Sequence, residues 1–369
     1  MAGDTSERDI ELVLVTGAGA SRSFGVAGQQ LPLMQDWSDA VCETLIRTDY
    51  RHLQLTGLEK GLDGPEFEQR LGDFLRRVEA FKLIEPLVGV SPPTQQIPPL
   101  STEALRGWYQ QEKFNLEKVV DLIHTSLYEQ FAEQAFDLVR ATKAYGELLE
   151  VLGVLGPTRP PFVVATTNYD PIAEEVLTMN SLLPDWGQKP MVNLTQSETG
   201  IEARGLIQGL PRYVPVLHLH GRIGWYSREV GGPYESTMKN HSAQFGTPIV
   251  MLPDPKKDYG SITLINDLWT EFGLALRRAK RVFILGHSLN DEPLRRAVVE
   301  NVDDLSRVAV GVYSEDGSEP HETTEKLQRI IREELVGAAT ILMCFGTILN
   351  RDAIANFMDR THRAGFGPA

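Results

Sequence analysis

Four short stretches of the 369-residue chain combine glycine, amide, carboxylate and imidazole groups that could bind an anionic ligand and act on it. They are Leu12–Gly25 (LVLVTGAGASRSFG), Val163–Pro171 (VVATTNYDP), Val216–Tyr226 (VLHLHGRIGWY) and Arg281–Leu294 (RVFILGHSLNDEPL). Each stretch begins with the apolar, β-branched residues of a buried strand and then changes to glycine and polar residues. Because ligands bind at the carboxyl ends of strands in an open α/β sheet, these polar ends are the candidate functional residues.

The first stretch predicts a phosphate-binding turn. A strand runs into Gly17, Ala18, Gly19 and Ser21 and then into a short helix, so free backbone N–H groups and a helix N-terminus would face an anion. The spacing is not GxGxxG and no GK[ST] follows, which disfavours a dehydrogenase or a P-loop enzyme. The alternative is a tight strand-to-helix turn that uses glycine for its geometry alone.

The second stretch delivers Thr167, Asn168 and Asp170 to the end of a buried strand. Asp170 directly precedes Pro171 and makes a good helix N-cap, a role that would account for it without any ligand. Asn168 has no equally simple structural role, which makes it the stronger candidate for a ligand contact.

The third stretch places His218 and His220 two residues apart on a predicted strand, where they share a face and could ligate a metal. The sequence offers no third ligand. Structural roles for both are a second interpretation, and general-base catalysis by one of them is the interpretation we favour. His220 is the better candidate, since it lies at the strand end beside Gly221.

The fourth stretch repeats the strand-to-helix pattern. Gly286 and Ser288 follow a strand, and Asn290 and Asp291 resemble a helix cap. The stretch predicts either a contact to an anion or ribose, or only a favourable turn.

The elements that would hold these motifs alternate between strands and helices. Short apolar runs predict parallel strands at Ile10–Thr16, Phe162–Thr167, Val214–Leu219, Arg281–Leu285, Arg307–Val312 and Thr340–Phe345. Apolar residues at three- and four-residue spacing predict helices at Pro171–Met179, Ile262–Ala279, Asp291–Asn301 and Pro320–Leu335. The pattern predicts an α/β fold with a doubly wound parallel, Rossmann-like sheet and a large helical insertion.

The insertion separates the first two strands by about 140 residues, far more than a crossover helix needs. Helices are predicted within it at Asp36–Thr48, Glu66–Leu87 and Phe114–Leu155. We therefore expect a core at 1–35 and 160–350, an inserted helical module at 36–159, a loop insertion at 180–215 and a C-terminal tail at 351–369.

Composition argues against several classes of protein. Hydrophobic residues make up 42% and charged residues 23%, as in ordinary globular proteins. The formal net charge of -14 disfavours direct nucleic-acid binding. Two cysteines, Cys42 and Cys344, are too few for a four-cysteine zinc site and suit a reducing compartment. With neither a signal peptide nor a membrane-length apolar run in the sequence, we expect a cytoplasmic protein without membrane contact.

Taken in order, GAGAS, TTNYD, LHG and GHSLND resemble the sirtuin-like NAD-binding family, specifically its zinc-free bacterial antiphage branch, over about Ile10–Tyr313. Leu31–Trp37 (LPLMQDW) is similar to the segment that follows the glycine loop in that branch. The chain lacks the paired cysteines of the deacylase zinc module, and GQQLPLMQDW replaces the GIPDFR-type loop of the deacylases. Both differences disfavour an acyl-lysine substrate.

This resemblance implies an NAD+ glycohydrolase that produces ADP-ribose and nicotinamide, with NAD+ as substrate and no zinc. It implies Asn168, His220 and Asp170 as catalytic residues, and Gly17, Ala18, Gly19, Ser21, Thr167, Gly286 and Ser288 as residues that bind the dinucleotide. It also implies a homo-oligomer that a separate partner activates, such as a HerA-type ring ATPase. A protein deacylase or ADP-ribosyltransferase, and a non-catalytic nucleotide-binding assembly subunit, are the alternatives.

Overall fold

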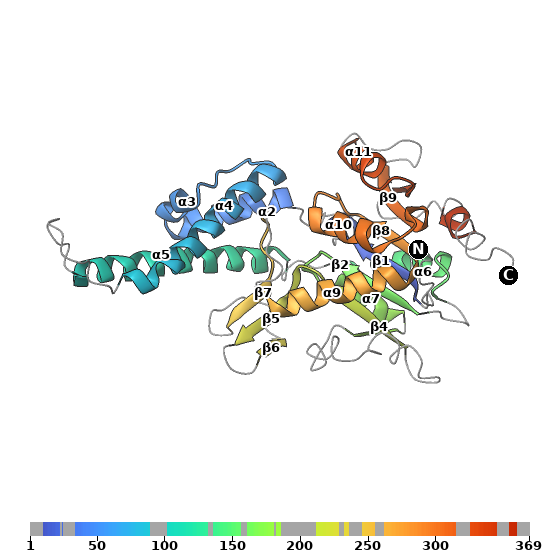
Figure 1. The fold of residues 1–369 in the computed structure, drawn as a ribbon, viewed down its shortest axis with the longest axis horizontal. Helices are drawn as coiled ribbons and strands as arrows, with labels where there is room; N and C mark the ends of the chain where they lie inside the picture. Colours follow the sequence, from blue (N-terminus) through green and yellow to red (C-terminus); the bar gives the residue numbers. More distant parts are fainter. Residues whose placement is uncertain are drawn as a thin grey trace, which may run out of the picture.

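The computed structural model describes residues 10–22, 24, 34–88, 102–131, 136–155, 161–180, 182–185, 212–228, 232–235, 246–254, 262–314, 325–344 and 354–359. Figure 1 shows an α/β core and an arm of helices that projects from one end of it.

A parallel sheet of seven strands forms the centre of the described core, in the order β10-β9-β8-β1-β2-β4-β3. The strands are β1 (Ile10–Thr16), β2 (Phe162–Thr166), β3 (Leu182–Asp185), β4 (Arg212–His218), β8 (Ala279–Leu285), β9 (Val308–Ser314) and β10 (Ala339–Cys344). The chain moves outward from β1 to β2 and later returns to the other side of β1 with β8. The predicted doubly wound sheet is confirmed, and its strand order reverses between β1 and β8.

Helices cover both faces of this sheet, which explains why its strands are apolar at almost every position. On one face, Val13 and Val15 pack with α9 (Thr263–Arg278), α10 (Glu292–Asn301) and α11 (Glu325–Glu333). On the other face, Leu12 and Leu14 pack with α6 (Leu138–Val151), α7 (Ile172–Met179) and the short helix at 354–359. Alternate residues of β1 thus contribute to two separate hydrophobic layers.

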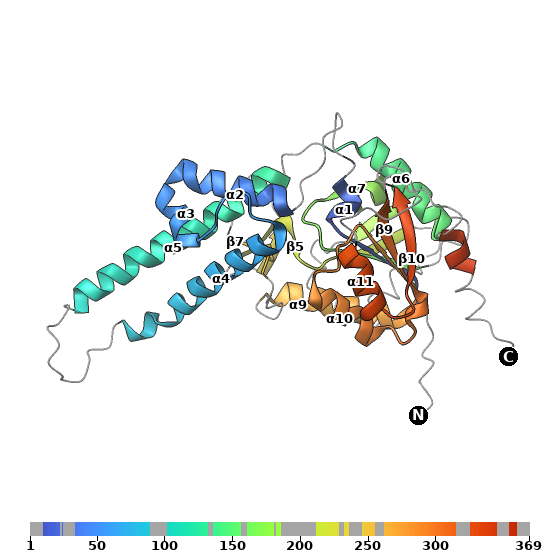
Figure 2. The ribbon, with the colours of Figure 1, turned by 90° about the horizontal axis from the view of Figure 1, so that it is seen from above.

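The arm consists of α2 (Met34–Thr48), α3 (Tyr50–Thr56), α4 (Gly64–Leu83), the 3-10 turn η2 (Glu85–Leu87) and α5 (Thr102–Phe131). Asp63 begins α4 by accepting a 2.8 Å hydrogen bond from the backbone N–H of Glu66. Figure 2 shows α4 and α5 running away from the sheet. The arm has its own core around Trp37 and Phe67, and this core extends to Tyr169 and Leu252 of the α/β part.

A small antiparallel sheet lies where the arm meets the core (Figure 1). Its order is β6-β5-β7, formed by β5 (Gly221–Arg228), β6 (Gly232–Glu235) and β7 (Thr247–Val250). The sequence patterns predicted none of these strands, nor β3. They are four to eight residues long and contain glycine, proline and polar residues, which weakens the apolar signal on which strand prediction depends.

Several predicted boundaries were wrong. The predicted helix Phe114–Leu155 is two helices, because α5 ends at Phe131 and Asp137 caps α6 by accepting from Arg140 N at 3.0 Å. α6 packs on α7 rather than in the arm. The strand predicted to reach Leu219 ends at His218, so Leu219 and His220 lie in a turn. Of the expected loop insertion 180–215, residues 181 and 186–211 lie outside the described residues, as do residues 31–33 of Leu31–Trp37. None of the described helices is long and apolar enough to cross a membrane.

Candidate functional site

The carboxyl ends of β1, β2, β4 and β8 meet at one edge of the sheet. Gly17 N donates to Leu285 O at 2.9 Å, which joins the ends of β1 and β8. Thr167 N donates to Thr16 O at 3.1 Å, and Leu219 N donates to Thr166 O at 2.8 Å. The four motifs of the sequence therefore lie together, at the reversal of strand order where open α/β sheets bind ligands.

Asn168 is held in one orientation by two groups on the β1–α1 turn, where α1 spans Ala18–Arg22. Its Nδ2 donates to Gly17 O at 3.2 Å and to Ser21 Oγ at 2.9 Å. A flipped amide would place Oδ1 against the Gly17 carbonyl, two acceptors facing each other. Both N–H bonds of Nδ2 are therefore directed at the protein, which leaves Oδ1 as the atom that can accept from a ligand hydroxyl or a water.

Asp170 follows on the same turn and binds the start of α7. Its Oδ1 accepts from Ile172 N at 3.0 Å, a contact typical of a capping aspartate, although Pro171 occupies the N-cap position of α7. Burial raises the pKa of Asp170 to about 6, and the charge of Glu174 acts in the same direction. The Ile172 N–H, His218 and the Ser21 hydroxyl oppose this shift. Asp170 therefore changes its charge close to neutral pH.

His220 forms a buried pair with Asp291. Nε2 of His220 lies 2.7 Å from Oδ2 of Asp291, and the two side chains are 8% and 6% exposed. Asp291 occupies the N-cap position of α10, yet its side chain makes no capping hydrogen bond. The capping role predicted for this side chain is wrong. The carboxylate instead faces the imidazole, an arrangement that fixes the orientation of the ring.

The turn that carries Asp291 is closely constrained. Gly286 has φ +62, and a Cβ there would lie 2.0 Å from Ala20 N. Glycine is therefore required at this position for the β1–α1 turn to pack against the turn after β8. Leu289 has φ 56, a rare conformation for a leucine, and is fully buried. The His287 Nδ1 accepts from Leu289 N at 2.9 Å, and Arg295 donates to Leu289 O. Strain held in place by several contacts is typical of a functional turn.

His218 belongs to a different cluster from His220. Its Nε2 lies 2.8 Å from Glu174 Oε1, and the same oxygen lies 2.7 Å from Nε of Arg222. Burial alone would raise the pKa of Glu174, but the attraction of His218 and Arg222 outweighs burial and lowers it to about 2. The two histidines thus face separate carboxylates and do not converge on one metal site, which supports the structural interpretation for His218.

The glycine loop differs from its prediction in one respect. The backbone N–H of Gly19 donates to Gly286 O at 2.9 Å, that of Gly17 donates to Leu285 O, and that of Ala20 donates to Gly17 O. The prediction that free amides of Gly17 and Gly19 face an anion is therefore wrong in this structure. A Cβ on Gly17 would lie 2.7 Å from Gly286 O, so close packing of two turns is what requires glycine here.

Metal ligands are not grouped in the described part of the chain. Among those residues, no set of three or more His, Cys, Asp and Glu side chains is placed to hold a metal ion. Cys42 is buried in the arm, and burial raises the pKa of its thiol to about 11. The expectation that the protein contains no zinc remains a prediction.

The structure brings Ser21, Asn168 and Asp170 into one group and His220 into a second at the same edge. Thr167 is half-buried beside them, and the exposed Ser288 accepts from Asn290 N at 3.4 Å.

Sequence reasoning missed Asp291 as the partner of His220. It also missed Tyr169, whose hydroxyl donates to Met251 O at 2.6 Å. Only the chain order TTNYD…LHG…GHSLND hints that Asp291 belongs to the same site.

No protein-family model matches the chain, and no curated protein matches it. Similar solved structures are Sir2 enzymes. One of them is a structure described as the basis for the mechanism and regulation of Sir2 enzymes. It is 10% identical to this chain, with a TM-score of 0.37, and the alignment covers 97% of this chain and 94% of that one. A Sir2 complex with an inhibitor, 2'-O-acetyl-ADP-ribose and a deacetylated p53 peptide shares 14% identity at a TM-score of 0.33, and the alignment covers 96% of this chain and 94% of that one.

Proposed function

We propose that the protein is an NAD+ glycohydrolase that cleaves the nicotinamide–ribose bond and releases nicotinamide and ADP-ribose. The observation that carries the proposal is the placement of an oriented amide, Asn168, and an imidazole–carboxylate pair, His220 and Asp291, at the ligand-binding edge of a doubly wound sheet. The order of the four sequence motifs, which resembles the sirtuin-like NAD-binding family, supplies the identity of the ligand.

The residues at this edge fit a dinucleotide. Glycine at 17, 19 and 286 keeps side chains off the two central turns. Ala18 and Ser288 are exposed beside those turns, and we assign them to the diphosphate and the adenosine half, respectively. Because the amides of Gly17 and Gly19 are already bonded, these two residues would support the diphosphate by shape rather than by hydrogen bonds.

Hydrolysis at this site needs a positioned water and a proton acceptor. Nicotinamide leaves NAD+ as a neutral molecule with the electron pair of the broken C1′–N bond, so it needs no proton. The oxygen of water forms the new bond to C1′ and loses its proton to His220. With Nε2–H donating to Asp291, Nδ1 is the nitrogen that takes this proton. Asn168 Oδ1 accepts from the ribose hydroxyl or the water, which sets the direction of attack.

We further propose a cellular setting for this activity. An NAD+ hydrolase that is always active would deplete a central metabolite of its own cell, so the activity must be restrained. In keeping with the resemblance to the antiphage branch, we propose that the chain acts in the cytoplasm as an NAD-depleting effector. It would form a homo-oligomer and remain weakly active until a separate partner, such as a HerA-type ring ATPase, engages it.

The decisive experiment measures nicotinamide release from NAD+ by the purified protein and by Asn168→Ala and His220→Ala. Each substitution should lower the rate by about 100-fold or more, the usual scale for loss of a positioned base, while circular dichroism stays unchanged. Asn180→Ala is the control, because Asn180 is an amide at the far end of α7 that donates to Thr142 O and Val176 O. Undiminished cleavage in both site variants would place the chemistry elsewhere.

A further inference from the structure

The segment that follows β7 holds the backbone of the candidate site. Met251 N donates to His220 O at 2.7 Å, and Met251 O accepts from the Tyr169 hydroxyl at 2.6 Å. Gly221, the residue after His220, has φ +79, and a Cβ there would lie 2.0 Å from Ile249 O. Residues 249–251 therefore lie directly against His220 and Gly221, and a shift of this segment must move the backbone that carries the imidazole.

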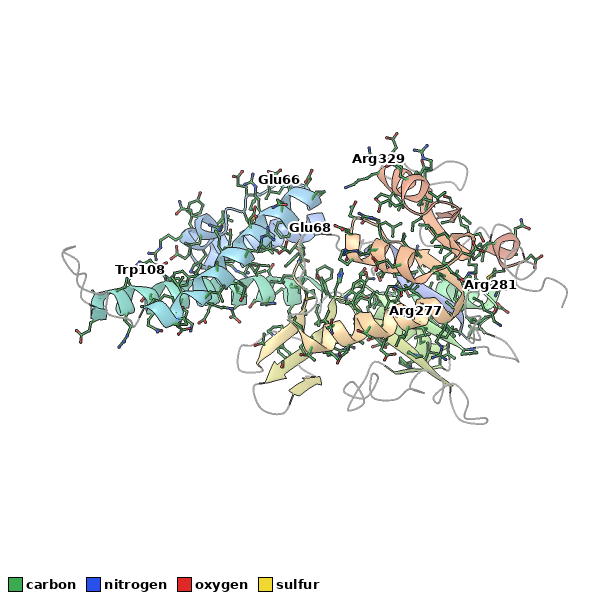
Figure 3. All side chains as sticks on the ribbon, viewed as in Figure 1. Glu66, Glu68, Trp108, Arg277, Arg281 and Arg329 are labelled. Atoms are coloured by element: carbon green, nitrogen blue, oxygen red, sulfur yellow. The ribbon has the colours of Figure 1, made fainter. Side chains whose placement is uncertain are left out.

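Three residues further on, the same segment is bound to the arm. Asp254 Oδ1 lies 2.5 Å from Nη1 of Arg76 on α4, and the Asp254 side chain is only 13% exposed. Arg76 also binds Asp73 through Nη2 at 2.7 Å, which holds the guanidinium in place on the helix surface. Figure 3 shows that α4 starts beside the core, with Glu68 at that end, whereas Trp108 of α5 lies at the far end of the arm.

A glycine inside α4 provides the second, independent observation. Glycine is disfavoured in the interior of a helix, yet Gly72 lies in the middle of the 20-residue α4. A Cβ on Gly72 would lie 2.5 Å from Asp254 Oδ1 and 3.1 Å from Arg76 Nη1. The missing side chain is therefore what lets the carboxylate lie against the helix and reach Arg76.

We infer that Gly72, Arg76 and Asp254 form a latch that positions His220 for catalysis, so that the placement of the helical arm sets the activity of the site. This inference rests on the proposed function for its kinetic consequence but not for its structural one. The connection runs from α4 through Asp254 and Met251 to His220, and it requires no contact between the latch and the substrate. Arg76 and Asp254 are positioning residues in this scheme.

Two kinds of variant test the latch. Arg76→Gln removes the charged partner, and Gly72→Ala displaces the Asp254 carboxylate while it improves helix propensity. Their controls are closely matched. Arg70→Gln removes another α4 arginine of similar exposure, 32% against 36%, whose ion pairs with Glu59 and Glu66 stay within the arm. Gly107→Ala adds a methyl inside α5, where a Cβ meets nothing within 4 Å.

Amide hydrogen exchange gives the structural readout. We expect residues 247–254 and 219–223 to exchange about tenfold faster in Arg76→Gln and Gly72→Ala, the scale of losing a hydrogen bond to a charged group, while β1 and β8 stay protected. Nicotinamide release should show kcat lowered about tenfold with KM nearly constant, because positioning of the base changes and NAD+ contacts do not. Arg76→Lys should restore part of both losses.

The controls define the results that overturn the inference. If Arg70→Gln and Gly107→Ala change exchange and kcat as much as the latch variants do, general weakening of the arm is the cause and the latch is wrong. Latch variants that match wild type in both readouts also overturn it. If wild-type protein releases no nicotinamide either alone or with a ring ATPase partner while the exchange pattern appears as expected, the proposed function fails and the latch stands.

Discussion

The imidazole of His220 and the carboxylate of Asp291 lie 2.7 Å apart although 71 residues separate them in the chain. They meet because β4 and β8 end at the same edge of the sheet, on either side of β1 and β2. Both side chains are almost fully buried, so solvent screens their interaction little. A carboxylate so placed fixes the imidazole ring and stabilises the imidazolium that forms when His220 takes a proton.

Replacement of Asp291 by Asn tests this pairing. The amide keeps the size of the side chain but loses the charge, so kcat for nicotinamide release should fall about 100-fold with KM nearly unchanged. The rate falls because the imidazolium that forms during the reaction loses its counter-charge. Glu292→Gln is the control, an exposed acid one residue further along α10. An unchanged kcat in Asp291→Asn would remove Asp291 from the mechanism.

The raised pKa of Asp170 predicts an effect of pH on the stability of the fold. Its folded-state pKa of about 6 lies above the ordinary aspartate value of 3.8, so the folded state binds a proton more tightly than the unfolded chain does. The stability that this group contributes is present below pH 4 and is lost as pH rises through 6. Asp170→Asn keeps an acceptor for Ile172 N and removes the buried charge. We expect it to be more stable than wild type at pH 7, by roughly 1–3 kcal/mol in urea denaturation, and equal to wild type near pH 4.

The same residue should affect activity over the same pH window. If the ionised form of Asp170 orients the substrate through Ser21 and Asn168, the wild-type rate rises with pH through about 6 and the Asp170→Asn rate does not. Steady-state nicotinamide release between pH 5 and pH 8 measures this. Equal profiles for the two proteins would restrict Asp170 to capping α7.

Much of the core could be predicted because it is buried on both faces. Val13 and Val15 on one side of β1 and Leu12 and Leu14 on the other give the continuous apolar run that identified the strand. Asn168 could be selected because no local structure accounts for it. The role of Asp291 could not, since an aspartate before a helix has the same sequence pattern whether it caps that helix or faces a histidine 71 positions away. The three strands β5, β6 and β7 depend on pairing with each other and on contact with the arm, neither of which leaves a local pattern.

Assembly gives the next prediction. The proposed restraint on NAD+ hydrolysis predicts a homo-oligomer with low basal activity that rises when a partner engages it, since a partner shifts such an equilibrium only through differential affinity. Size-exclusion chromatography with light scattering, and an NAD+ assay at the same protein concentration, measure both properties with and without a ring ATPase. A monomer that is fully active alone contradicts the proposal.

Glu174 predicts how acid affects the fold. Its carboxylate is 4% exposed, and His218 and Arg222 hold its pKa at about 2 against the effect of burial, compared with 4.5 for an ordinary glutamate. A lowered carboxylate pKa contributes stability that is present above pH 4.5 and is lost as pH falls toward 2. In urea denaturation, the free energy of unfolding of wild type should therefore fall between pH 5 and pH 3 by about 1–2 kcal/mol more than that of Glu174→Gln. The variant should already be less stable than wild type at pH 7, because His218 and Arg222 lose their buried counter-charge. Glu175→Gln, an exposed acid on the next position of α7, should follow the wild-type curve. Parallel curves for wild type and Glu174→Gln would show that the ion cluster around His218 does not stabilise the fold.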